Sequence, residues 1–267
     1  MKKYMAFFRL RFLMGLQYRA AALAGIVTQF FWGAMNILMY HAFYESDPSA
    51  FPMTMEATAT YIWLQQALLM LFAAWMIEHE IFDDILSGNV AYTLCRPVSV
   101  YDMWFFRSMA NRLSRAVLRC APILLTAVFL PKGYGMSLPA SWLHFALFLL
   151  TGVLGFLVTV AFFMLVYALT FYTISPNGLR ILISSVVEFF AGAVIPLPFF
   201  PDRVREVFEL LPFAAMQNVP LRVYSASMSG GEMTRAIALQ VFWLITLVFA
   251  GKLLIGMALR RMSVQGG

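Results

Sequence analysis

Charged side chains are scarce in this chain of 267 residues. Asp, Glu, Lys and Arg make up 12% of it, whereas hydrophobic residues make up 62%, and the mean hydropathy is +0.78. A soluble fold of this length cannot bury so much apolar surface, so the composition predicts an integral membrane protein. The apolar runs continue for about twenty residues, the length of a membrane-spanning helix, and lack the alternation of β-barrel strands. We therefore expect an all-α fold.

The residues that many enzymes and metal sites need are also few. The two cysteines are Cys95 and Cys120, and there are three histidines. Their spacing matches neither a metal site nor a disulfide framework. The net charge of +6 is spread over short segments between apolar runs, which indicates membrane topology rather than nucleic-acid binding. We expect no catalytic residue, no metal and no cofactor on this chain, and no nucleic-acid partner.

A Gly-rich loop of the kind that holds nucleotide phosphates is absent too. Residues 228–232 read Met-Ser-Gly-Gly-Glu and resemble the signature sequence of ABC ATPases, but no P-loop ending in Gly-Lys-Ser/Thr accompanies them. We interpret Gly230 and Gly231 as an external turn before the last helix. The chain is expected to bind no nucleotide itself.

Six hydrophobic segments are predicted to cross the membrane. They cover residues 20–43, 57–77, 116–130, 142–172, 176–194 and 236–259. Basic residues gather before the first segment, between the second and third, and at the end of the chain. Because such residues mark cytoplasmic loops, we expect both termini in the cytoplasm. The chain is then one multi-pass domain, residues 1–267, in the cytoplasmic (inner) membrane.

Residues 1–19 precede the first predicted span. They place Met5, Phe8, Phe12 and Leu16 on one helical face among basic residues. Basic side chains suit anionic headgroups, so this pattern predicts an amphipathic helix lying on the inner leaflet, in contact with membrane lipid.

The cytoplasmic loop after the second span, residues 78–99, is predicted to contain a short amphipathic helix. Its acidic residues are Glu78, Glu80, Asp83 and Asp84, and its apolar residues at helical spacing are Ile81, Phe82, Ile85 and Leu86. Ser-Gly-Asn at residues 87–89 ends the helix. Anionic lipid would repel four acids, which favours a protein partner over the headgroup layer.

Two stretches carry a family resemblance. Gly88, followed by Leu94, Arg96, Pro97, Val98 and Ser99, resembles the Gly…Leu-x-Arg-Pro-Val-Ser stretch after the second helix of type 2 ABC transporter permeases. Residues 192–197, together with Phe200-Pro201, Leu211-Pro212-Phe213 and Val219-Pro220, look like the external segment of a subfamily formerly described only as a domain of unknown function. The resemblance extends over essentially the whole chain.

This resemblance implies specific partners. The permease would pair with a second permease, a heterodimer being favoured over a homodimer, and with two separate ATPase subunits that carry ATP and Mg²⁺. Residues 78–89 would form the coupling helix and residues 94–99 its return. The ATPase-coupling residues would then be Glu78, Phe82, Asp83, Asp84, Ile85, Gly88, Arg96 and Pro97. The family often has a basic residue and a glycine where this chain has Asp83 and Asp84.

Polar residues and prolines at membrane depth mark a candidate translocation pathway. Its members are Gln65, Gln66, Glu188, Pro196 and Pro198. The prolines predict that the fifth span breaks near the outer leaflet, and that residues 202–211 form a short re-entrant helix within the external segment 195–235. The alternative roles are interhelical hydrogen bonding for the two glutamines and a packing role for Glu188.

We therefore predict the transmembrane subunit of an ATP-driven ABC exporter that moves an amphipathic drug, lipid or peptide, such as a multidrug exporter. A stand-alone proton-coupled secondary transporter is the alternative, with Glu188 carrying the proton. A non-transporting membrane scaffold is a third possibility.

Overall fold

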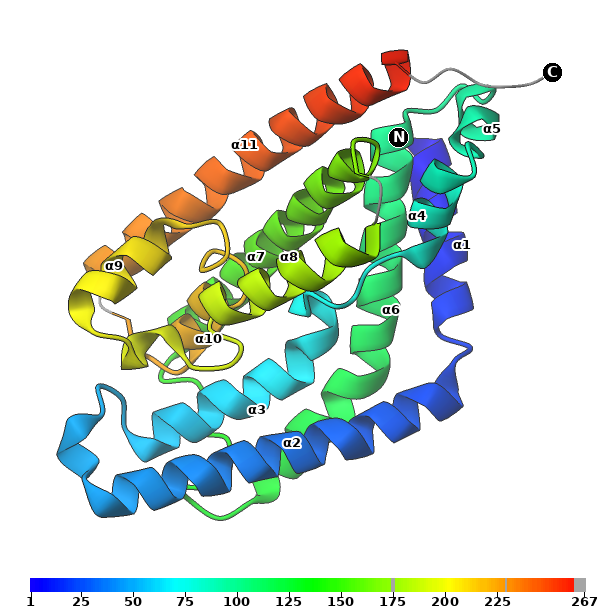
Figure 1. The fold of residues 1–267 in the computed structure, drawn as a ribbon. Helices are drawn as coiled ribbons and strands as arrows, with labels where there is room; N and C mark the ends of the chain where they lie inside the picture. Colours follow the sequence, from blue (N-terminus) through cyan, green and yellow to red (C-terminus); the bar gives the residue numbers. More distant parts are fainter. Residues whose placement is uncertain (174–175, 229, 262–267) are drawn as a thin grey trace.

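The computed structural model describes residues 1–173, 176–228 and 230–261 (Figure 1). Within these residues the chain forms eleven α-helices and two 3₁₀ helices, with no strand. The predicted all-α fold is thus confirmed. The α-helices are α1 (Lys2–Gly15), α2 (Arg19–Ser46), α3 (Met55–Phe72), α4 (His79–Leu86), α5 (Val90–Leu94), α6 (Val100–Phe129), α7 (Trp142–Thr170), α8 (Pro176–Phe190), α9 (Asp202–Leu210), α10 (Asn218–Tyr224) and α11 (Gly230–Arg261), and the 3₁₀ helices are η1 (Pro48–Ala50) and η2 (Leu197–Phe199).

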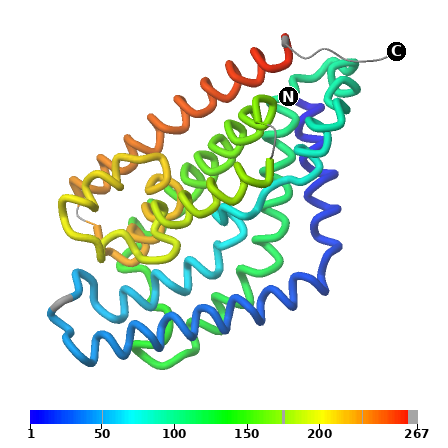
Figure 2. The backbone as a smooth tube through the Cα atoms, in the orientation of Figure 1, coloured from blue at the N-terminus to red at the C-terminus, as the bar shows by residue number. Residues whose placement is uncertain are grey.

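The short helices lie at the two ends of the molecule. Figures 1 and 2 show α4 and α5 at the same end as the start of α1 and the end of α11, with α9 and α10 at the opposite end. The long helices run between these two ends. Helices α4 and α5 are thus separated from α9 and α10 by the length of the helical bundle.

Three helices, α2, α7 and α11, are long and apolar enough to cross a membrane. The other three predicted spans fall in α3, α6 and α8, and their predicted limits need correction. α3 ends at Phe72 and does not reach residue 77. α6 has 30 residues and begins at Val100 rather than at residue 116. α8 has 15 residues and ends at Phe190.

The centre of the bundle is α7. Its buried residues include Val158, Phe163, Met164 and Tyr167, each with no exposed side-chain surface. The Nε2 of Gln240 on α11 donates to two backbone oxygens, that of Thr151 on α7 at 3.0 Å and that of Ala215 at 2.9 Å. In a lipid environment, close packing and such interhelical hydrogen bonds hold helices together.

The N-terminal helix α1 packs along α6. Tyr4 stacks on Phe106 with ring centroids 5.7 Å apart, and its hydroxyl accepts a hydrogen bond from the backbone N–H of Ser99 at 2.9 Å. Of the predicted apolar stripe, Phe8, Phe12 and Leu16 are half-buried, whereas Met5 is exposed. One face of α1 therefore binds a protein helix.

In the segment predicted to be external, residues 195–235, the structure buries a different helix from the expected one. The predicted helix after Pro201 is present as α9, but none of its residues is buried. All seven residues of α10 are buried, Pro220 and Arg222 among them. Within the protein, burial therefore falls on α10 rather than on the stretch 202–211.

The last helix also begins earlier than expected. Gly230 and Gly231 form the first turn of α11, so the interpretation of these glycines as a turn before that helix is wrong. Ser229 of the same Met-Ser-Gly-Gly-Glu stretch lies outside the described residues.

Candidate functional site

The loop helix α4 turns its apolar face into the protein. Ile81 is fully buried, and Phe82 and Ile85 expose 5% and 9% of their surfaces. The ring of Phe82 meets that of Tyr167 on α7 edge to face, with centroids 5.4 Å apart. Two of the predicted coupling residues, Phe82 and Ile85, thus fix α4 onto the transmembrane helices.

The N-terminal end of α4 is bound through polar contacts as well. The backbone N–H of Glu78 donates to the Tyr167 hydroxyl at 2.9 Å, and the Nδ2 of Asn111 on α6 donates to Glu78 Oε2 at 2.7 Å. Glu80 forms ion pairs with the guanidinium groups of Arg11 on α1, at 3.3 Å, and of Arg107 on α6. Three helices therefore hold the first turn of α4.

A buried arginine organises the segment 73–78 between α3 and α4. Nη1 of Arg112 donates to the backbone oxygens of Leu71 and Ala73, each at 3.0 Å, and Nη2 donates to that of Met76 at 2.6 Å. Its guanidinium also lies 4.7 Å from the ring centre of Phe163. Leu71 and Ala73 lie at the C-terminal end of α3, where helix carbonyls lack intrahelical donors, so a cation there binds them and complements the helix dipole.

The end of α4 follows the predicted pattern. Ser87 donates its backbone N–H to the carbonyl of Asp83 at 2.9 Å, and Gly88 to that of Ile85 at 3.3 Å. Gly88 has φ +75°, a left-handed conformation that L side chains rarely adopt, so glycine here terminates the helix. α5 follows directly, and Lys3 of α1 donates to the backbone oxygen of Pro97 in the return segment, residues 94–99.

The outer face of α4 and the return segment are exposed. Asp83, Leu86, Arg96 and Pro97 are exposed, whereas Glu78, Asp84 and Gly88 are half-buried. Burial raises the pKa of the Asp84 carboxyl, and the neighbouring Asp83 raises it further, while Arg11 acts in the opposite direction. An acidic face with one large apolar side chain, Leu86, remains free for a partner.

Three of the predicted pathway residues line one groove. Gln65 and Gln66 of α3 and Glu188 of α8 border a space of about 680 Å³, together with residues of α2 and α6. Gln65 also donates to the backbone oxygen of Ala193 at 2.6 Å, so it links helices while facing the groove. The carboxyl group of Glu188 borders the groove and forms no ion pair or hydrogen bond with the residues that the structure describes.

The predicted prolines lie elsewhere. Pro196 and Pro198 are buried at η2 and do not border the groove. The adjoining Phe199 packs against Tyr40 and Phe51, with ring centroids 5.3 and 5.7 Å away. The structure therefore brings together the polar pathway residues and separates them from the prolines.

The comparisons with known proteins bear on this arrangement. A sequence profile of the ABC-2 family transporter proteins matches residues 30–266. The chain belongs to the ABC-2 transporter family. No curated protein and no solved structure matched it. Membership makes the chain a permease, a transmembrane subunit without an enzymatic role of its own, and implies association with ABC ATPase subunits.

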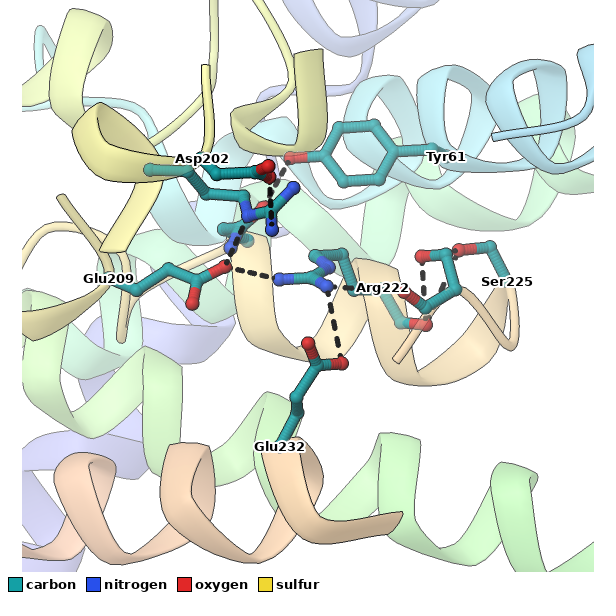
Figure 3. Close-up of polar contacts among 9 residues, drawn as sticks. Tyr61, Asp202, Glu209, Arg222, Ser225 and Glu232 are labelled. Carbon is teal, nitrogen blue, oxygen red and sulfur yellow. Dashed lines mark hydrogen bonds and ion pairs between the residues drawn. The ribbon is translucent and has the colours of Figure 1, made fainter. Parts of the chain in front are cut away.

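At the opposite end of this permease, Arg222 of α10 joins three segments (Figure 3). Its Nη1 donates to Glu209 Oε1 of α9 at 2.5 Å, and its Nη2 lies 3.7 Å from Glu232 Oε2 of α11. Arg222 exposes only 4% of its surface. Because a buried cation requires such partners, this ion-pair network joins α9, α10 and α11 at this end of the permease.

Several important residues were not singled out from the sequence. Arg107 and Arg112 belong to the basic residues between the second and third predicted spans, and the sequence assigned them no contact of their own. A signal was available, since Arg107, Asn111, Arg115 and Arg119 recur every four residues on one helical face. That face of α6 contacts α2 and the segment 76–80 of the permease.

Proposed function

We propose that this permease is the transmembrane subunit of an ATP-driven exporter that moves an amphipathic drug, lipid or peptide across the cytoplasmic membrane. It crosses the membrane six times, through α2, α3, α6, α7, α8 and α11, with both termini in the cytoplasm. Separate ATPase subunits bind ATP and Mg²⁺, and a second permease, in a heterodimer, completes the pathway. Family membership supports this proposal.

One observation carries the coupling mechanism. The segment 73–78 connects α4 directly to α3, and Trp75 within it borders the groove that Gln65, Gln66 and Glu188 line. When an ATPase displaces α4, the segment 73–78 moves with it, and Trp75 then changes the shape of the groove. Arg112 binds this segment, so the displacement also reaches α6. Alternating access then follows from a rigid-body shift of packed helices.

The roles of the coupling residues divide by exposure. Asp83, Arg96 and Pro97 are exposed and contact the ATPase, as does Leu86, which is 57% exposed. Phe82 and Ile85, being buried, transmit the displacement to α7. Glu78 does so through its hydrogen bond to Tyr167.

The proposal is tested by affinity purification of the tagged permease from its native membrane in mild detergent. The test variant combines Asp83→Arg and Leu86→Ala on the exposed face of α4. The matched control combines Glu206→Arg and Val207→Ala on α9, which are exposed at the opposite end. We expect an ATPase subunit to co-purify with the wild type and the control, and to be lost from the α4 variant.

Other outcomes are equally informative. Retention of the ATPase by the α4 variant would move the contact away from α4. If no ATPase accompanies the wild type, the exporter proposal is overturned. The proton-coupled transporter then becomes the better reading, because Glu188 borders the groove without a described partner, and a proton-flux assay of Glu188→Gln decides it.

A further inference from the structure

A second cavity lies between α1, α2 and α6, beside the first turn of α4. Its volume is about 400 Å³. Its charged lining residues are Arg11, Glu78, Glu80, Arg115 and Arg119, and its apolar ones include Met14, Ala21, Ala22 and Leu118. Two of its lining residues also have places above, since Glu78 contacts Tyr167 and Arg119 borders the groove, whereas Arg115 takes no part in the proposed coupling or pathway.

The carboxylates of the cavity already have partners. Glu80 is shared between Arg11 and Arg107, and Glu78 accepts a hydrogen bond from Asn111. Arg115 and Arg119 form no ion pair with a carboxylate among the described residues. Nη1 of Arg115 is 3.1 Å from the Sδ of Met76, a weak acceptor. The cavity therefore has an excess of positive charge.

Arg119 in particular has unused hydrogen-bonding capacity. Its Nη2 donates to the backbone oxygen of Ala21 at 3.3 Å, but its buried Nε has no partner among the residues described. Its guanidinium lies over Gly25 of α2, where a Cβ would come within 2.2 Å of Cζ. Glycine at this position is therefore what lets the arginine side chain pass between α2 and α6.

We infer that this cavity binds the phosphate of an anionic membrane lipid through Arg115 and Arg119. A guanidinium pairs with phosphate oxygens through two parallel charge-assisted hydrogen bonds. Basic pockets between membrane helices on the cytoplasmic side suit lipid headgroups. Both arginines then acquire the anionic partner that the protein does not provide.

The surroundings favour a lipid over a free phosphate ion. Arg119 borders both this cavity and the groove that Gln65, Gln66 and Glu188 line, so the two spaces meet at its side chain. Leu23 and Val27 of α2 and Val117 of α6 are each more than half exposed nearby along these helices. A soluble phosphate would gain nothing from these apolar surfaces, whereas acyl chains would cover them.

The test measures binding of dioleoyl phosphatidylglycerol to the purified full-length protein in nonionic detergent by native mass spectrometry. Diacylglycerol, which lacks the phosphate, and inorganic phosphate are separate arms. We expect saturable binding of the phosphatidylglycerol, none of the diacylglycerol, and no displacement by millimolar inorganic phosphate. Arg115→Gln and Arg119→Gln should each weaken binding about tenfold, which is the loss of one charge-assisted contact.

A control variant and the exposure of Arg115 keep the test decisive. Arg9→Gln removes an exposed charge on α1 outside the cavity and should bind phosphatidylglycerol as the wild type does. Arg115 is exposed, so Arg115→Gln should fold normally even if Arg119→Gln does not. Equal binding by Arg115→Gln and the wild type, or equal binding of diacylglycerol, would overturn the inference. Displacement by inorganic phosphate would overturn the lipid as the occupant.

Discussion

The backbone N–H of Glu78 donates a hydrogen bond to the side-chain oxygen of Tyr167, 2.9 Å away. Tyr167 is fully buried on α7, and its ring also meets those of Phe82 and Trp104. The start of the loop helix α4 is thus attached to the centre of the protein. This attachment makes α4 a part of the transmembrane body rather than a mobile loop.

Tyr167→Phe should uncouple ATPase binding from transport. The ring contacts remain, but the half-buried N–H of Glu78 loses its acceptor, which costs about 1–3 kcal/mol. We expect the ATPase to co-purify at wild-type levels while substrate-stimulated ATP hydrolysis in proteoliposomes falls several-fold. Tyr172→Phe, which alters an exposed tyrosine just after α7, is the control. Unchanged stimulation in Tyr167→Phe would show that this hydrogen bond does not transmit the displacement of α4.

Arg112→Gln should strongly destabilise the fold. Three backbone oxygens lose their charged donor in a fully buried site, and at roughly 1 kcal/mol for each bond the loss is about 3 kcal/mol. The midpoint of thermal unfolding, followed by size-exclusion chromatography of the detergent-solubilised protein after heating, should fall clearly. Arg9→Gln, an exposed arginine on α1, should leave it unchanged. A small effect of Arg112→Gln would mean that the segment 73–78 is held by other contacts.

Glu209→Ala should release α9 without unfolding the bundle. Glu209 provides the closest carboxylate to Arg222, whereas α9 buries none of its own residues. Trypsin added to the external face should then cleave within α9, which contains Arg203 and Arg205, much faster than in the wild type. The control Glu206→Ala lies on the same helix and forms no ion pair among the described residues. Equal cleavage rates in the two variants would argue against the Glu209–Arg222 contact as the restraint.

Asp84→Asn should stabilise the protein at neutral pH. The folded state raises the pKa of Asp84 above its ordinary value of 3.8, first through burial and then through Asp83. The folded form therefore binds the proton more tightly than the unfolded form, and stability falls as the pH rises from the ordinary pKa through the raised one. The gain from Asp84→Asn should appear above this window and vanish below it. Thermal unfolding of both proteins across acidic and neutral pH measures this, and a gain that persists at the acidic end would exclude titration of Asp84 as its cause.

The long apolar helices were predictable from the sequence because membrane burial of a backbone leaves few alternatives to a helix. The amphipathic helix at α4 and its termination at Gly88 were also predictable, since an apolar stripe and a left-handed glycine are local signals. The protein surface that the apolar stripe of α4 contacts was not predictable. Phe82 and Ile85 face the chain's own helices, and a helical pattern alone does not say which protein covers it.

The premature end of α3 also escaped prediction. Residues 73–77 continue the apolar run without a proline or glycine, so local propensity favours more helix. The competing interaction comes from Arg112, distant in sequence, which binds the carbonyls of Ala73 and Met76. Tertiary contacts overrode propensity here. The helical face shared by Arg107, Asn111 and Arg115 was the available indication that α6 has such a role.

The shortness of two helices affects the lipid around them. At about 1.5 Å per residue, the 18 residues of α3 extend about 27 Å and the 15 residues of α8 about 22 Å, whereas a bilayer's hydrocarbon layer is about 30 Å thick. Both helices border the groove. Hydrophobic mismatch of this kind thins the bilayer locally. In the proposed six-span topology the membrane would therefore be thinnest beside the polar groove, where a polar group would have the shortest distance of hydrocarbon to cross.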